Sequence, residues 1–134
     1  MGVIVVGYVA KPEGLAALRA SAEEAKRRGA KLVVVNSHRG GREFDRADGT
    51  ESESQLDEVR SQLKAAGVEN EIRQLVRGMD PAEDLISVAS EVSADLIVIG
   101  LRRRSPVGKL ILGSNAQRIL LDASCPVLAV KATE

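Results

Sequence analysis

Aromatic side chains are nearly absent from this chain of 134 residues, since Tyr8 and Phe44 are the only two. Modules that stack nucleic-acid bases on aromatic platforms need several such side chains. A basic excess is lacking as well, because 19 Lys and Arg residues are balanced by 19 Asp and Glu residues. The two absences argue against nucleic acid as a partner.

Cysteine and histidine are equally scarce, with Cys125 and His38 the single members of their types. One cysteine cannot form an internal disulfide, which suits a reducing cytoplasm. One Cys and one His cannot supply the usual zinc ligands, so no metal site is expected. Apolar runs of about six residues are far shorter than the ~20 needed to span a membrane. The chain opens on an apolar run without a basic leader, and we expect a cytoplasmic protein without a signal peptide.

The chain does contain short runs of Val and Ile, as strands buried on both faces of a sheet require. These runs span residues 3–9, 31–36, 72–76, 95–99 and 127–130. Helical patterns separate them, and this alternation predicts an α/β fold in which an open five-stranded parallel sheet carries helices on both faces. The length is that of one domain, which we expect to cover residues 1–134.

The expected helices carry recognisable end signals. The first apolar stripe at helical spacing ends at Gly29, a residue typical of helix C-termini. Asp80 before Pro81 predicts an acidic N-cap with proline at the first helical position. Ser114, three residues before Gln117, repeats the capping-box spacing.

Two long connections separate the expected elements. The polar stretch 38–54 is rich in Gly, Arg, Asp and Glu and is interpreted as a mobile loop over the carboxyl ends of the strands. The connection 101–113 follows the fourth strand. Ligands of open α/β sheets lie at this edge, so these two stretches are where a site is expected.

The second connection is bounded by glycines. Gly100 lets a ligand or a neighbouring backbone approach the strand end. Gly113 directly precedes a helix N-terminus, where free N–H groups and the helix dipole favour an anion. Ser114 either caps that helix or gives its hydroxyl to a phosphate. The segment is therefore either a phosphate cradle or a pair of turn glycines with an ordinary cap.

Several stretches together resemble the universal stress protein family over the whole chain. They are Ile-Val-Val-Gly at 4–7, Gly-Met-Asp-Pro-Ala-Glu-Asp at 78–84, Ala-Asp-Leu-Ile-Val-Ile-Gly at 94–100, Leu-Gly-Ser-Asn-Ala-Gln-Arg-Ile at 112–119 and Cys-Pro-Val-Leu-Ala-Val at 125–130. The resemblance implies a Rossmann-like sheet, similar to that of adenine nucleotide α-hydrolases, with strand order 3-2-1-4-5. It further implies a regulatory domain, not an enzyme, that binds ATP or another adenine nucleotide at the carboxyl ends of strands 1 and 4.

Many family members bind ATP through the motif G-x2-G-x9-G-[S/T]. Gly100, Gly113 and Ser114 occupy three of its positions, whereas Arg103 replaces the second glycine. Val9 stands where nucleotide-binding members commonly carry an aspartate. Arg103 is either a bidentate phosphate ligand or part of a solvated cationic loop. The resemblance implies nucleotide contacts from Val9, Ser37, Gly100, Leu101, Arg103, Gly113, Ser114 and Asn115.

Two further functions stay open at this point. Because two motif positions are altered, the alternative is a nucleotide-free dimeric stress-response or interaction protein of the same fold. An ATP-hydrolysing enzyme would need a metal-binding carboxylate and a water-orienting group near the phosphates, and the sequence identifies neither. Family members often pair through the last strand, so we expect a homodimer, with no membrane partner, whose interface includes Val127, Leu128, Ala129 and Val130.

Overall fold

The computed structural model describes residues 2–9, 11–38, 46–76, 80–101 and 113–132, without the side chains of 37, 38, 46–53 and 76. Strands and helices alternate along the described chain. In order they are β1 (Val3–Gly7), α1 (Pro12–Arg28), β2 (Lys31–His38), α2 (Arg46–Ala65), β3 (Asn70–Val76), α3 (Pro81–Glu91), β4 (Leu96–Leu101), α4 (Ser114–Asp122) and β5 (Val127–Lys131).

All five strands form one parallel sheet in the order β3-β2-β1-β4-β5. The central pair is β1 and β4, in which Val5 lies opposite Ile97. This order confirms the prediction of an open α/β sheet with strand order 3-2-1-4-5. Parallel neighbours need crossover connections, and each is made here through a helix.

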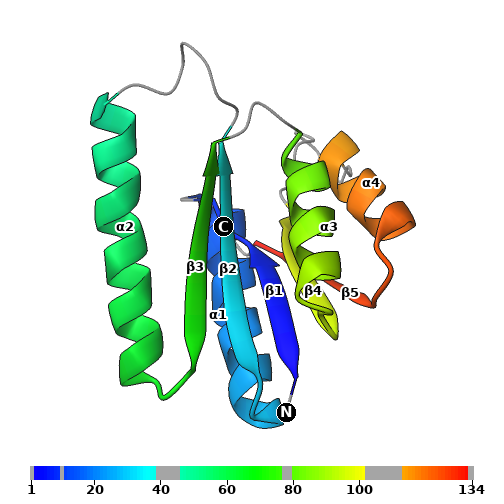
Figure 1. Cartoon of the computed structure of the whole chain (residues 1–134), viewed down its shortest axis with the longest axis horizontal. Helices are drawn as coiled ribbons and strands as arrows, with labels where there is room; N and C mark the ends of the chain where they lie inside the picture. The colour runs from blue at the N-terminus through cyan, green and yellow to red at the C-terminus, as the bar shows by residue number, and fades with distance from the viewer. Residues whose placement is uncertain (1, 10, 39–45, 77–79, 102–112, 133–134) are drawn as a thin grey trace.

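Helices cover both faces of the sheet, as predicted (Figure 1). Ile4 and Val6 of β1 point toward α1 and α2, whereas the intervening Val5 points toward α3 and α4. All three side chains are fully buried. A parallel strand needs apolar residues on both faces because each face is packed against a helix, which explains the unbroken Val and Ile runs.

Several predicted helix ends are confirmed. Gly29 ends α1 in the left-handed conformation, with φ of 62°, and its N–H reaches the carbonyls of the last turn. Asp80 caps α3, because its Oδ1 accepts a hydrogen bond of 3.0 Å from the N–H of Ala82. The capping box predicted at Ser114 is wrong, since the N-cap of α4 is Gly113 and no side chain closes it.

The interpretation of 38–54 as a loop is wrong for its second half. Residues 46–54 form the first turns of α2. This stretch has no apolar periodicity in the sequence, whereas Leu56, Val59 and Leu63 farther along α2 pack on the core. A helix formed there can extend toward its N-terminus without a new nucleation cost, which sequence periodicity does not register.

Candidate functional site

The connections of β1 and β4 diverge, and a site is expected at the point where they do. The chain leaves β1 for β2 on one side and leaves β4 for β5 on the other. In open α/β sheets, such a switch point at the carboxyl ends of the strands is where ligands bind. Helices α3 and α4 both begin at this edge of the sheet (Figure 1).

The N-terminus of α4 offers free backbone donors at that edge. Gly113 is extended, with φ of −71° and ψ of 166°, and as a glycine it has no side chain to cap the first turn. The N–H of Gln117 is the first to join the helical ladder, at 3.0 Å from the carbonyl of Gly113. The N–H groups of residues 114–116 therefore precede the ladder, and Ser114 and Asn115 are exposed. This is the geometry that accepts an anion.

The N-terminus of α3 is different, because its own carboxylates occupy it. Asp80 caps the helix, and Glu83 and Asp84 follow in the first turn. Asp84 is itself buried, with 1% of its surface exposed. An anion would meet negative charge here, so α4 and not α3 is the better anion site of the two.

Arg118 connects these two helix starts. Its guanidinium lies 3.3 Å from Asp80 Oδ2 and 2.7 Å from Glu83 Oε1, both on the α3 side, and 3.7 Å from Asp122 Oδ2 on α4. The hydrogen bond to Glu83 contributes most to raising the pKa of Arg118 above its ordinary value. Arg118 was not among the site residues predicted from the sequence. Its signal was only an arginine one turn after Ser114.

Helix α1 begins in close contact with the ends of both central strands. A Cβ on Gly100 would overlap the backbone carbonyl of Glu13, and a Cβ on Gly14 would overlap the carbonyl of Val9. The sequence predicted that either a ligand or a neighbouring backbone approaches Gly100. In the structure it is a neighbouring backbone, that of Glu13. Gly14 was missed in the sequence, although a glycine in the first turn of a helix is a signal of close approach.

Val9, at the carboxyl end of β1, offers no polar side chain to a ligand. Val9 is 41% exposed, and its carbonyl accepts a hydrogen bond of 2.8 Å from the N–H of Lys11. Tyr8 packs into the core, where burial raises the pKa of its hydroxyl and Glu58 adds to the effect. Asn36 donates to the Tyr8 carbonyl at 3.1 Å, and its Oδ1 is buried without a hydrogen-bond partner.

The other predicted site residues are brought to the same edge to differing degrees. Leu101 ends β4 with its side chain in the core and its carbonyl 3.1 Å from the N–H of Ala132. The backbone of Ser37 lies one residue before the end of β2, opposite Leu75 of β3. Arg103 lies outside the described residues. A contact from Leu101 would therefore come from its backbone.

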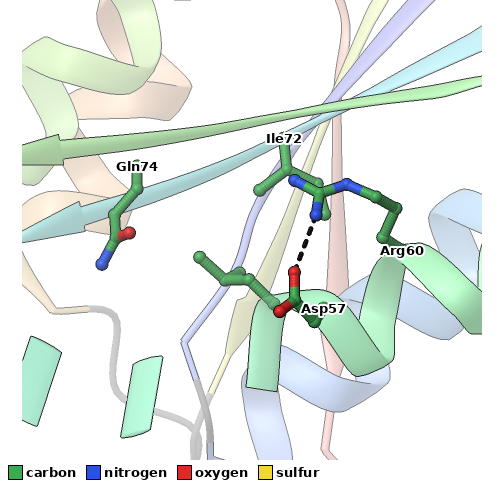
Figure 2. Close-up of a pocket in the computed structure, with 5 residues that line it drawn as sticks. Asp57, Arg60, Ile72 and Gln74 are labelled. Atoms are coloured by element: carbon green, nitrogen blue, oxygen red, sulfur yellow. Dashed lines mark hydrogen bonds and ion pairs between the residues drawn. The ribbon is translucent and has the colours of Figure 1, made fainter. Parts of the chain in front are cut away.

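A separate pocket lies between α2 and the edge strand β3, two strands away from β1 (Figure 2). Its volume is about 360 Å³, and Leu56, Ile72 and Gln74 contribute to its lining together with Asp57 and Arg60. The guanidinium of Arg60 lies 2.8 Å from Asp57 Oδ1, one turn away on the same helix. None of the predicted site residues that the structure describes lines it.

Among the residues that the structure describes, no three His, Cys, Asp or Glu side chains are grouped so that they could hold a metal ion. The helices in the described ranges are all too short or too polar to cross a membrane.

Comparison with known proteins places the chain among relatives of one family. The profile of the universal stress protein family matches residues 1–131. A universal stress protein from Mycolicibacterium smegmatis is 48% identical over 128 residues, which are 96% of each chain. The structure of the universal stress protein from Archaeoglobus fulgidus in complex with dAMP is similar with a TM-score of 0.74 and 34% identity over 98% of both chains. A universal stress protein in complex with cAMP is similar with a TM-score of 0.76 and 25% identity, again over 98% of both chains.

Proposed function

The chain belongs to the universal stress protein family, and from that premise we propose that it is a regulatory domain that binds an adenine nucleotide at the carboxyl ends of β1 and β4. The observation that carries this proposal is the N-terminus of α4 at the switch point, where the N–H groups of residues 114–116 precede the helical ladder and the N-cap residue is a glycine. The dAMP and cAMP complexes of the two similar proteins support adenine as the base.

In this proposal the chain binds mainly through its backbone. The N–H groups that follow Gly113 receive the phosphates, and the hydroxyl of Ser114 adds a donor. Gly100 and Leu101 border the ribose, and the backbone around Ser37 meets the base. These contacts need no carboxylate at Val9, although the ribose then loses a hydrogen-bond acceptor. The residues present thus fit the phosphates better than the sugar.

Among adenine nucleotides we propose ATP first, because Arg103 would favour a triphosphate over a monophosphate. A guanidinium in the connection before α4 adds positive charge where a triphosphate carries the most negative charge. The role we propose is regulatory, without a dedicated reaction. The free thiol of Cys125 is consistent with the reducing cytoplasm as its location.

We also propose a homodimer through β5, which is an edge of the sheet. Ile97 donates to the carbonyl of Pro126, and the N–H of Ala132 donates to Leu101. Even-numbered residues of this stretch therefore pair with β4, and the backbone groups of Val127, Ala129 and Lys131 face the open edge. The other edge strand, β3, carries the charged Glu71 and Arg73, which discourage pairing, whereas β5 carries only Lys131.

Thermal unfolding and calorimetry with ATP, AMP and cAMP test the nucleotide proposal, with GTP as the control for the base. A ligand at a hundred times its Kd stabilises the folded state by about 2.7 kcal/mol, which raises Tm measurably. We expect a Tm increase with at least one adenine nucleotide and a smaller one with GTP. No shift at millimolar concentrations of every adenine nucleotide, in a protein that sediments as a dimer, would favour the nucleotide-free interaction protein.

A further inference from the structure

Helix α4 has little apolar anchorage for an element that we propose to hold phosphates. It has nine residues, and Ile119 is the buried one among them. Ala116 on the helix and Ala123 just after it pack against the same core but are only partly buried. Leu121 is 82% exposed. Small and partly exposed contacts of this kind leave the rotation and tilt of a short helix poorly determined.

The ion pairs of Arg118 supply what the apolar contacts lack. The side chain of Arg118 bonds α4 to the start of α3, since it contacts both Asp80 and Glu83. A planar guanidinium that bridges two carboxylates fixes direction as well as distance. Asp80 is itself held, since its other oxygen accepts from the N–H of Ala82, a fully buried residue. These bonds thus fix the position of α4 relative to the first turn of α3, which packs on the sheet.

We infer that Arg118 is a positioning residue, which orients the first turn of α4 for phosphate binding by pairing with Asp80 and Glu83 of α3. This inference rests on the proposed nucleotide site. Arg118 lies one turn beyond Ser114, so a rotation of the helix about its axis moves the donors of residues 114–116 directly. Exposed ion pairs add little to global stability, and Arg118 is 38% exposed. Its removal therefore weakens binding more than folding.

The charge of Glu83 distinguishes a positioning role of Arg118 from direct attraction between Arg118 and the phosphates. If Arg118 acted only through its own charge, Glu83→Gln would remove a competing negative charge near the phosphates and tighten binding. If Arg118 acts by holding α4, the same substitution breaks the 2.7 Å contact and weakens binding. The two roles thus predict opposite signs for Glu83→Gln.

The experiment measures ATP affinity by calorimetry in the parent, Arg118→Ala, Glu83→Gln and the double variant. We expect Arg118→Ala to weaken binding about tenfold, the lower end of the effect seen when partners that orient metal ligands are removed. Glu83→Gln should weaken it less, and the double variant no more than Arg118→Ala alone, because the residues act as a unit. The control is Arg73→Ala, which removes an arginine paired with Glu71 and Glu91 on the β3 side of the sheet and should leave affinity unchanged.

Each outcome decides one of the two proposals. Equal affinity in the parent and Arg118→Ala would overturn positioning, as would tighter binding by Glu83→Gln. If the parent binds no adenine nucleotide, the proposed function fails and positioning is decided by amide exchange in the ligand-free protein. Arg118→Ala should then speed exchange at residues 117–122 more than in α3, and unchanged exchange would overturn it.

Discussion

Gly100 and the backbone carbonyl of Glu13 lie so close that no side chain larger than hydrogen fits between them. The contact joins the end of β4 to the first turn of α1. Gly14 makes the reciprocal approach, with its Cα against the carbonyl of Val9. The start of α1 is thereby held against both central strands, so the motif glycine at 100 has a packing role independent of any ligand.

Gly100→Ala should therefore destabilise the fold in the absence of nucleotide. The added Cβ meets backbone that can move only with α1, and overpacking of this kind typically costs about 1–3 kcal/mol. Urea unfolding of the parent and variant measures the difference. Gly7→Ala is the matched control, because its Cβ would lie 3.2 Å from Cδ2 of Leu85, the far end of a side chain that can shift. Equal losses in both variants would contradict a special role for the approach at Gly100.

Ser114→Asp and Gly113→Val should abolish nucleotide binding while the protein stays folded. A carboxylate at the first position of α4 repels phosphate, and a β-branched side chain at the N-cap blocks access to the free N–H groups. Thermal shift with ATP reports binding, and circular dichroism reports the fold. Ser124→Asp, in the exposed turn beyond α4, adds the same charge away from the donors and should bind normally. Retained stabilisation of both site variants by ATP would move the site elsewhere.

Arg103 tests how far the departure from the family motif matters. If its guanidinium pairs with phosphate, Arg103→Ala weakens binding by about 1–3 kcal/mol, the range of a charged hydrogen bond. If it instead obstructs the cradle, Arg103→Gly restores the motif and tightens binding. We expect the first outcome, measured by calorimetry with ATP and AMP. The same affinity in all three proteins would show that Arg103 makes no contact with the ligand.

The strands and the helix ends followed from local chemistry. Val5 and Ile97 belong to runs whose apolar character has one physical origin, burial on both faces of a parallel sheet. Gly29 and Asp80 end and begin helices for reasons that act within a few residues. The strand order required the family resemblance, because loop lengths and apolar patterns are the same for several orders of parallel strands.

The parts of the site that the sequence did not predict depend on contacts between distant residues. Glu13 lies 87 residues before Gly100 in the chain, and no pattern in either segment signals that their backbones meet. Arg118 and Glu83 are 35 residues apart, and charged residues on a helix are most often solvated. The turns of α2 before Leu56 were missed because apolar periodicity records packing, not helix formation itself.

Acid should weaken the contribution of Glu71 to stability. Arg73, at 2.5 Å, and Lys31, at 3.1 Å, hold the pKa of Glu71 below its ordinary value, with the hydrogen bond from Arg73 contributing most. Because the pKa of Glu71 is lowered in the folded state, its carboxylate stabilises the fold at pH values above the ordinary pKa of 4.5. This stabilisation is lost as the pH falls through the lowered pKa of the folded state. Because the carboxylate is partly exposed, the effect is at most about 1 kcal/mol.

The measurement compares unfolding of the parent and Glu71→Gln between pH 3 and pH 7. We expect the parent to be more stable at neutral pH and the two curves to converge in acid. Glu69→Gln is the control, because it removes an exposed carboxylate two residues from Glu71. It should leave the pH dependence of stability as it is in the parent. A constant difference between the parent and Glu71→Gln across the range would contradict the assignment.

Backbone N–H groups of neighbouring residues in β5 point in opposite directions, one toward β4 and the next toward the open edge. Proline substitutions at two adjacent positions therefore test the dimer. The N–H of Ala129 faces the open edge, so Ala129→Pro removes a donor that only a partner strand would use. Leu128 faces β4, so Leu128→Pro breaks a bond inside the subunit and should lower the stability of the fold itself. We expect Ala129→Pro to sediment as a folded monomer and the parent as a dimer at tens of micromolar. A parent that sediments as a single species of 14.2 kDa would rule out the dimer, and a dimeric Ala129→Pro would place the interface on another surface.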